Sequence, residues 1–370
     1  NPPRPPGSLA MKPTTFLPQR ILPFAALLAA LLAALATSAA LAQVPGVSQS
    51  PLHVAGALPG NLALVPSVEY PTIISVANLG DYDEDTPYVG YFDSGKCYQY
   101  HYSSTESERH FYPIRTTNDH RCTDSDAPWS GNFLNWAATQ TIDPFRKALT
   151  GGYRVRDDAS DSAAVRLRGT WLEKARHDRV DDGLYPNRSI ESANGSDIVS
   201  GATPFADGRF VGRGRDRRWV YNELHIRIGG LDNRMRFRLN NSDVDHDVGN
   251  YDPNDDCDDD ACQATVRVRV CVPGLLESNC KPYGSHWKPE GTLQEYADRM
   301  RYAVIGFLND SNVQRDGGVL RSEMKYIGPT IPGEFGPQSN PNPEWDTETG
   351  VLEINPHSAE ANATSGATIT

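Results

Sequence analysis

The chain has 370 residues, enough to bury a sizeable core, and it combines 38% hydrophobic residues with 31 glycines and 28 prolines, which indicates one core with long polar loops. Its formal net charge is −12 at pH 7. That charge argues against nucleic acid as a partner, because phosphate backbones are bound by basic surfaces. It favours an exported protein that meets divalent cations.

The N-terminus has the pattern of an export signal. We expect residues 1–10, which precede Met11, to be upstream translation outside the fold. Residues 11–42 then show a positive region, an apolar run and a small-residue cleavage site, as signal peptides do. We predict cleavage between Ala42 and Gln43, followed by a leader over 43–60. A retained anchor is the alternative, but no later stretch is long and apolar enough to span a bilayer.

Six cysteines in an exported chain indicate disulfides, because the compartment is oxidising. An even set of this size allows about 15 pairings. Short spacing favours three local bridges, which are Cys97 with Cys122, Cys257 with Cys262, and Cys271 with Cys280. A zinc site is the weaker alternative, since no CxxC occurs and no histidine pair lies near these cysteines.

Two helical pieces are expected over residues 130–149. Phe133, Leu134 and Trp136, followed by Ile142, Phe145 and Leu149, recur at helical intervals. The interruption at Asp143-Pro144 places the proline in a first turn, where a missing N–H costs little. Thr150-Gly151-Gly152 ends the second piece.

The stretch from Trp287 to Pro329 predicts a loop, a helix and a buried strand. Thr292 can cap a helix with Glu295 three residues later, and the apolar run Arg301–Leu308 is typical of a covered strand. Gln263–Val272 is the clearest alternating strand upstream. We predict that these three elements form a βαβ unit with a right-handed crossover.

Two charged segments stand out. Asp243, Asp245 and Asp247 alternate like the first carboxylates of a calcium loop. The turn glycine and the closing glutamate of such a loop are missing, so an acidic surface insertion is the alternative to a calcium site. Arg209–Arg218 is the one dense basic run. Phosphate or cell-surface polyanions could bind it, but we favour a solvated edge strand.

Enzymatic function is not expected. The nine histidines are scattered, no nucleophile elbow appears, and no glycine-rich phosphate loop follows a strand. Glu290 and Asp298 are the best-placed single acids. A loop position and a helix surface explain them.

The segment KPEGTLQEYADRMRYAV with QRDGGVLRSEMKYIGP resembles the N-terminal region of the PilY proteins, type IV pilus tip-associated adhesins and biogenesis factors. Gly90-Tyr91-Phe92-Asp93 with Lys96-Cys97-Tyr98, and Ser130–Ala137 through Leu149–Gly152, extend the resemblance across about residues 60–355. It implies an α/β fold, a von Willebrand factor A-like doubly wound sheet with long insertions. We expect that domain over 61–328 and a flexible tail, joined in the family to a β-propeller, over 329–370.

The resemblance also implies a function. It predicts a binding protein of the periplasm, outer-membrane surface or pilus tip, which contacts minor pilins and host or abiotic surfaces during pilus assembly, attachment and twitching motility. The A-type fold normally places a DxSxS metal signature after its opening strand. This chain has Pro66-Ser67-Val68-Glu69-Tyr70 there, and Thr203 is a weak match to the separate threonine ligand. A purely structural periplasmic domain contacting minor pilins is therefore the alternative.

Overall fold

The computed structural model describes residues 59–66, 75–126, 128–160, 164–176, 187–191, 197–228, 233–240, 261–307, 318–333 and 335–353. All of them belong to one compact unit, Leu58–Thr370. The other unit, Asn1–Ala57, lies outside the described residues, and so do the predicted signal peptide and its cleavage site.

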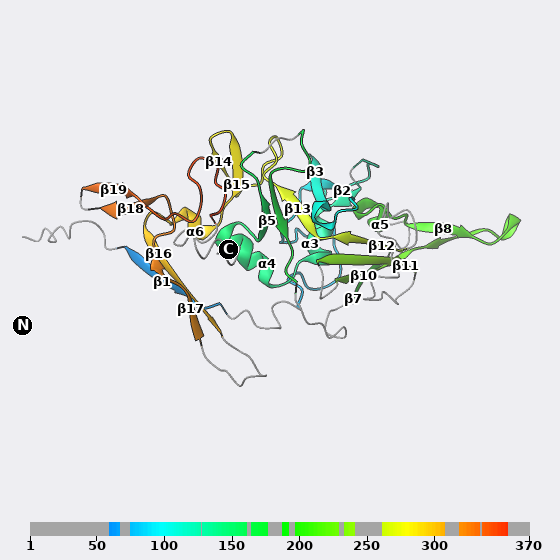
Figure 1. The fold of residues 1–370 in the computed structure, drawn as a ribbon. Helices are drawn as coiled ribbons and strands as arrows, with labels where there is room; N and C mark the ends of the chain where they lie inside the picture. The colour runs from blue at the N-terminus through cyan, green and yellow to red at the C-terminus, as the bar shows by residue number, and fades with distance from the viewer. Residues whose placement is uncertain are drawn as a thin grey trace, which may run out of the picture. The chain divides into compact units, whose positions relative to one another are not determined.

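A six-stranded mixed sheet forms one half of the core (Figure 1). Its strand order is β4-β2-β3-β13-β6-β5, and only β3 and β13 pair in parallel. The strands are β2 (Lys96–His101), β3 (His110–Thr116), β4 (Trp129–Ser130), β5 (Arg154–Asp157), β6 (Thr170–Glu173) and β13 (Arg267–Val270).

A four-stranded antiparallel sheet forms the other half, in the order β12-β11-β10-β7. Its strands are β7 (Asn187–Glu191), β10 (Glu223–Ile228), β11 (Arg234–Leu239) and β12 (Ala261–Thr265). In β10, Leu224, Ile226 and Ile228 are fully buried while the residues between them are partly exposed, as expected of a sheet with one face on the core.

Helix α3 (Gly131–Ala138) is buried along its whole length and contacts β2 of one sheet and β10 of the other. Phe133 of the helix lies 6.3 Å from Phe237 of β11, between ring centroids, and Trp129 lies 5.1 Å from the same ring. The two sheets therefore share one aromatic core, with α3 at its centre.

A third sheet has the order β1-β16-β17, with β1 (Gly60–Leu64) parallel and β17 (Gly318–Lys325) antiparallel to β16 (Met300–Phe307). Three hairpins complete the strands. They are β8 (Gly208–Val211) with β9 (Arg218–Tyr221), β14 (Cys280–Tyr283) with β15 (His286–Pro289), and β18 (Thr330–Gly333) with β19 (Gly336–Ser339). Regular structure thus continues into the segment predicted as a tail.

The remaining helices are short: α4 (Ile142–Thr150), α5 (Ile198–Ala202) and α6 (Thr292–Glu295), with 3-10 turns η1 (Glu106–Glu108) and η3 (Gly214–Asp216). The predicted helical pieces are confirmed as α3 and α4. Gly151, at φ +83°, ends α4, in the left-handed conformation that glycine tolerates best.

The predicted βαβ unit is wrong. The run Gln263–Val272 divides at Val266 between two sheets: β12 pairs with β11 and β13 pairs with β3 and β6. The strand after α6 belongs to the third sheet. Helix α6, Thr292–Glu295, is a single turn with Gly291 as its N-cap and Tyr296 as its C-cap.

The fold is mixed α/β, rich in strands and poor in helices, with two disulfides whose cysteines are both described. The doubly wound sheet is not confirmed. Among the described strands, parallel pairing is confined to β1 with β16 and β3 with β13, whereas a doubly wound sheet is mostly parallel.

Candidate functional site

A cleft of about 680 Å³, lined by both polar and apolar side chains, lies among the described residues. Its walls come from the loop 88–94, from α4, from the loop 277–281, and from the residues around α6. Three of them, the loop 88–94, α4 and the residues around α6, overlap segments that carry the sequence resemblance, and the loop 277–281 does not. Charged residues of both signs line it: Asp93, Lys147, Glu277, Lys281, Glu290 and Glu295.

The first wall is held by two buried asparagines of α3. Asn135 donates from Nδ2 to the carbonyls of Tyr88 and Phe92, both at 3.0 Å, and its Oδ1 accepts from the N–H of Phe92 at 3.1 Å. Asn132 Oδ1 accepts from the N–H of Tyr88 at 2.8 Å. A buried loop needs such partners for its peptide groups, so α3 determines the shape of this wall.

Glycine permits the close approach of loop and helix. A Cβ on Gly90 would lie 2.1 Å from Asn135 Oδ1, and a Cβ on Gly131 would lie 2.1 Å from the carbonyl oxygen of Asp93. The close contact between the loop 88–94 and α3 therefore explains why Gly90 and Gly131 are glycines.

The opposite wall is formed where α6 packs on the end of α4. Thr292 Oγ1 donates to the carbonyl of Ala148 at 3.1 Å, and Gln294 Nε2 donates to that of Thr150 at 2.9 Å. Gln294 Oε1 also accepts from the N–H of Gly291 at 3.0 Å, which caps α6. The predicted cap between Thr292 and Glu295 is thus replaced by a cap from Gln294.

An ion pair lies at the base of the cleft. Lys96 Nζ is 2.7 Å from Glu277 Oε1 and 3.2 Å from Asp93 Oδ2, and it donates to the carbonyl of Leu275 at 2.6 Å. Both Lys96 and Glu277 are buried. Removing one partner of such a pair leaves a buried charge uncompensated, so the pair ties the loop 88–96 to the loop 271–280.

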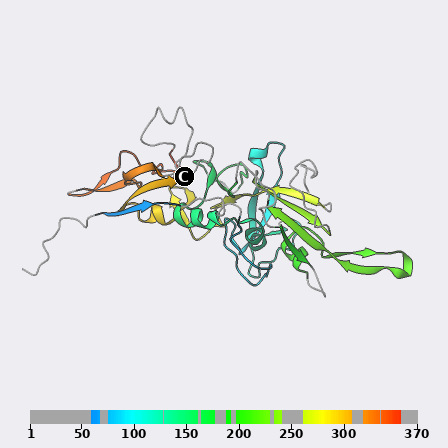
Figure 2. The same ribbon diagram turned by 90° about the horizontal axis from the view of Figure 1, so that it is seen from below.

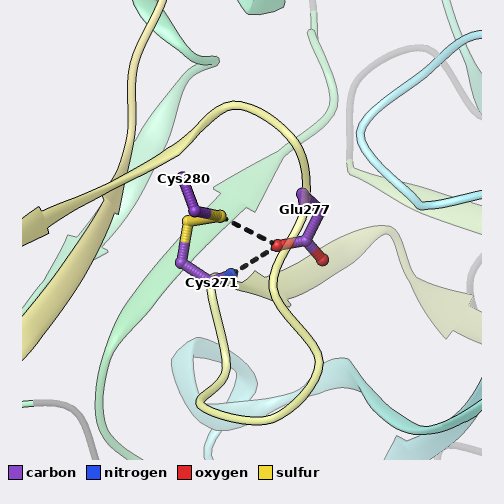
Figure 3. A group of neighbouring side chains, drawn as sticks. All are labelled: Cys271, Glu277 and Cys280. Carbon is purple, nitrogen blue, oxygen red and sulfur yellow. Dashed lines mark hydrogen bonds between the residues drawn. A yellow bond between two sulfur atoms is a disulfide. The ribbon is translucent and has the colours of Figure 1, made fainter.

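Glu277 also contacts the Cys271–Cys280 disulfide (Figure 3). Its Oε2 accepts from the N–H of Cys271 at 2.7 Å, and Cys280 Sγ lies 3.2 Å from the same oxygen. The three side chains are of the types that bind metal ions, and their ligand atoms lie close together. Because the sulfurs are bonded to each other, they are not thiolate ligands, and the cluster positions the cleft loop.

Lys147 reaches into the cleft from α4 and donates from Nζ to the carbonyl of Gly90. Burial lowers the pKa of its amino group, and Lys96 acts in the same direction, whereas Glu277 and Asp93 oppose the shift. Besides the hydrogen that it donates to Gly90, its ammonium carries two more hydrogens. The cleft can therefore accept a carbonyl or carboxylate at Lys147 and donors at Asp93, Glu290 and Glu295.

The predicted disulfides Cys97–Cys122 and Cys271–Cys280 are confirmed, each with a Cα–Cα distance of 5.6 Å. Cys262 is disulfide-bonded, but its predicted partner Cys257 lies outside the described residues. Asp243, Asp245 and Asp247 lie outside them too, so the calcium site stays a prediction. Thr203 is buried and donates to the carbonyl of Val199 at 2.6 Å.

Sequence reasoning missed Asn132, Asn135 and Lys147. The signal was present for the asparagines, because two amides in an otherwise apolar helix need buried partners. Nothing local marked Lys147. Within the described part of the chain, no helix is long and apolar enough to cross a membrane.

A family model described as "PilY1 homolog, small alpha/beta domain" matches residues 80–207. A curated protein of Xylella fastidiosa, "Type IV pilus biogenesis factor PilY1 homolog", is 46% identical over 333 residues, or 86% of this chain. A second protein of that organism with the same name is 26% identical over 277 residues, or 69% of the chain. The chain spans 25% and 17% of the lengths of these relatives. No solved structure matches. The chain belongs to the PilY1 family.

Proposed function

We propose that the chain is an exported binding protein of type IV pilus biogenesis. The observation that carries the proposal is the 46% identity, over 86% of the chain, with a relative named as a type IV pilus biogenesis factor. The proposed location is the periplasm, the outer-membrane surface or the pilus tip, and the proposed partners are minor pilins. Attachment to surfaces and a contribution to twitching motility belong to the same proposal.

We assign the partner contact to this cleft. Three of its four walls overlap segments that carry the family resemblance, and the disulfide and the buried Lys96–Glu277 pair fix the loops on either side of Lys96 and Glu277. Rigid walls lower the entropic cost of binding a partner. Charges of both signs beside apolar side chains such as Phe92 and Pro144 suit a pilin segment that carries both charged and apolar residues.

A charge exchange at the rim of the cleft tests this assignment. Lys281 and Glu295 are exposed and line the cleft, so Lys281→Glu with Glu295→Lys inverts the local pattern at constant net charge. We expect loss of surface pili in the native bacterium at unchanged levels of exported protein. Arg299→Glu with Glu323→Lys, also exposed but away from the lining, is the matched control and should preserve piliation.

Full piliation by the cleft variant, at normal protein levels, would refute the cleft as the pilin contact. Failure of the chain to reach the envelope fraction would refute the proposal as a whole. Normal piliation with lost surface attachment would place the cleft in adhesion instead of assembly.

A further inference from the structure

Strands β8 and β9 form a hairpin, Gly208–Tyr221, none of whose residues lines the cleft. Figures 1 and 2 show it extending beyond the edge of the four-stranded sheet in both views. Among the described strands, β8 and β9 pair with each other alone, in a two-stranded sheet. The sequence predicts a solvated edge strand at Arg209–Arg218, and the structure has a projecting hairpin there, which we call the basic hairpin.

One face of the basic hairpin is aromatic. Phe210 and Trp219 are direct cross-strand partners, and Tyr221, two residues beyond Trp219, lies on the same face. Their rings pack together, with centroids 4.9 Å apart for the first pair and 6.5 Å for Trp219 and Tyr221. The three side chains are nevertheless 58%, 44% and 39% exposed, in that order along the chain. The hairpin thus presents a contiguous aromatic surface to solvent.

The backbone is adapted to this surface. A Cβ on Gly208 would lie 2.7 Å from Trp219 Cε2, so the indole packs over Gly208, its diagonal neighbour on the other strand. Gly212, at φ +95°, forms the turn after β8, in a conformation that other residues rarely adopt. The exposed ring of Trp219 is therefore held in one orientation by the hairpin itself.

The rest of the hairpin is strongly basic in an acidic protein. Arginines occupy five of its positions and aspartate one, which gives a local charge of +4 against −12 for the whole chain. All five guanidinium side chains are exposed: Arg209, Arg213, Arg215, Arg217 and Arg218. The guanidinium carbon of Arg217 lies over the ring of Phe210, 4.8 Å from its centroid. A positive charge is therefore part of the aromatic surface.

We propose that the basic hairpin docks on a lipid surface that carries phosphate headgroups. Aromatic side chains favour the interface between water and hydrocarbon, and amphipathic helices that combine aromatic and basic side chains lie in that interface, so the same two kinds of side chain suit the hairpin to it. Arginine pairs with phosphate through a planar, two-pronged donor set. A projecting hairpin is also convex and carries an exposed Phe210, which suits insertion between headgroups better than the polar recognition of a polysaccharide chain.

Vesicle sedimentation of the exported chain tests the proposal. We expect binding to vesicles of phosphatidylcholine with phosphatidylglycerol and none to phosphatidylcholine alone. Each basic residue near an anionic surface is worth roughly a fivefold change in partitioning, so Arg213→Glu with Arg215→Glu and Arg217→Glu should reduce binding by about a hundredfold or more. The three Arg→Lys changes should retain most of it, and Trp219→Ser should weaken it at unchanged charge.

The matched control reverses three exposed arginines elsewhere, Arg168→Glu with Arg299→Glu and Arg321→Glu. An equal loss in this control would overturn the proposal, since net charge alone would then explain binding. Binding to heparin without binding to anionic vesicles would overturn it in favour of a polysaccharide partner. Release from vesicles by inorganic phosphate at unchanged ionic strength would show capture of the free ion only, and would also refute docking on lipid.

Discussion

At the scale of single residues, buried polar groups do more than any surface group to define this structure. Asn135 satisfies three peptide groups of the loop 88–92, and Glu277 satisfies Lys96 and a peptide N–H. Leaving one such buried group unsatisfied costs about 1–3 kcal/mol. The cleft is therefore shaped by hydrogen bonds that connect residues far apart in sequence.

Asp143 predicts a pH dependence. It is buried at the start of α4, where burial raises the pKa of its carboxyl from 3.8 to about 6. The folded state thus favours the protonated acid, so the stabilisation is complete below the unfolded pKa and is lost as pH rises through about 6. We expect Asp143→Asn to match the wild type near pH 4 and to exceed it by up to about 3 kcal/mol near pH 7. Urea unfolding at both pH values measures this.

Asp346→Asn is the control, and its effect on stability should change with pH in the opposite direction. Hydrogen bonds from Thr349 lower the pKa of Asp346, so its ionised form is favoured by folding, and Asp346→Asn should lose stability at neutral pH relative to acid. Equal stability differences at both pH values for Asp143→Asn would contradict the prediction.

At the scale of elements, the packing of α6 on α4 depends on Gly291. A Cβ there would lie 2.3 to 2.5 Å from backbone atoms of Leu149 and Thr150. Gly291→Ala should therefore separate the two helices and cost about 1–3 kcal/mol, measured by urea unfolding. Gly95→Ala is the matched control, because its Cβ would meet nothing closer than 3.5 Å. Equal stability of the two variants would show that α6 shifts freely.

Elements were predictable where their signals are local. The spacing of apolar residues predicted α3 and α4, a continuous apolar run predicted β16, and short cysteine spacing predicted the two bridges that are described. The division of Gln263–Val272 was not predictable, because Val266 alternates with its neighbours like any strand residue. Its N–H instead donates to the carbonyl of Asn233 at 2.7 Å, and this tertiary contact decides where one sheet ends. The Lys96–Glu277 pair, 181 residues apart, is equally invisible in sequence patterns.

At the scale of the whole molecule, the two large sheets are joined in two ways. The continuous segment Gln263–Val272 supplies a strand to each sheet, and a buried group of charged and polar side chains lies between them. Arg267 of β13 donates from Nε to Glu173 of β6 at 2.9 Å, and Asn233, just before β11, donates to the same carboxylate oxygen at 2.8 Å. Glu173 and Arg267 are buried. The sheets should therefore unfold as one cooperative unit.

Glu173→Ala tests this coupling. The change removes the buried carboxylate from Arg267 and leaves it only the more exposed Glu106, at 3.4 Å, which costs up to about 3–5 kcal/mol. We expect hydrogen exchange to accelerate in β6 and in β11 together. Glu323→Ala, an exposed acid, is the control. Acceleration confined to the six-stranded sheet would mean that the two sheets unfold separately.

The parallel pairing of β1 with β16 brings together residues 240 positions apart, as the bond between Asn61 and Arg301 shows. A ribosome releases a chain from its N-terminus, so β1 emerges long before its partner has been made. Until then the backbone N–H and C=O groups of β1 are unpaired and can bond to any other strand, which is a route to aggregation. Pairings across such long separations also form slowly. This sheet is therefore closed late in folding, and β1 needs protection until β16 is available.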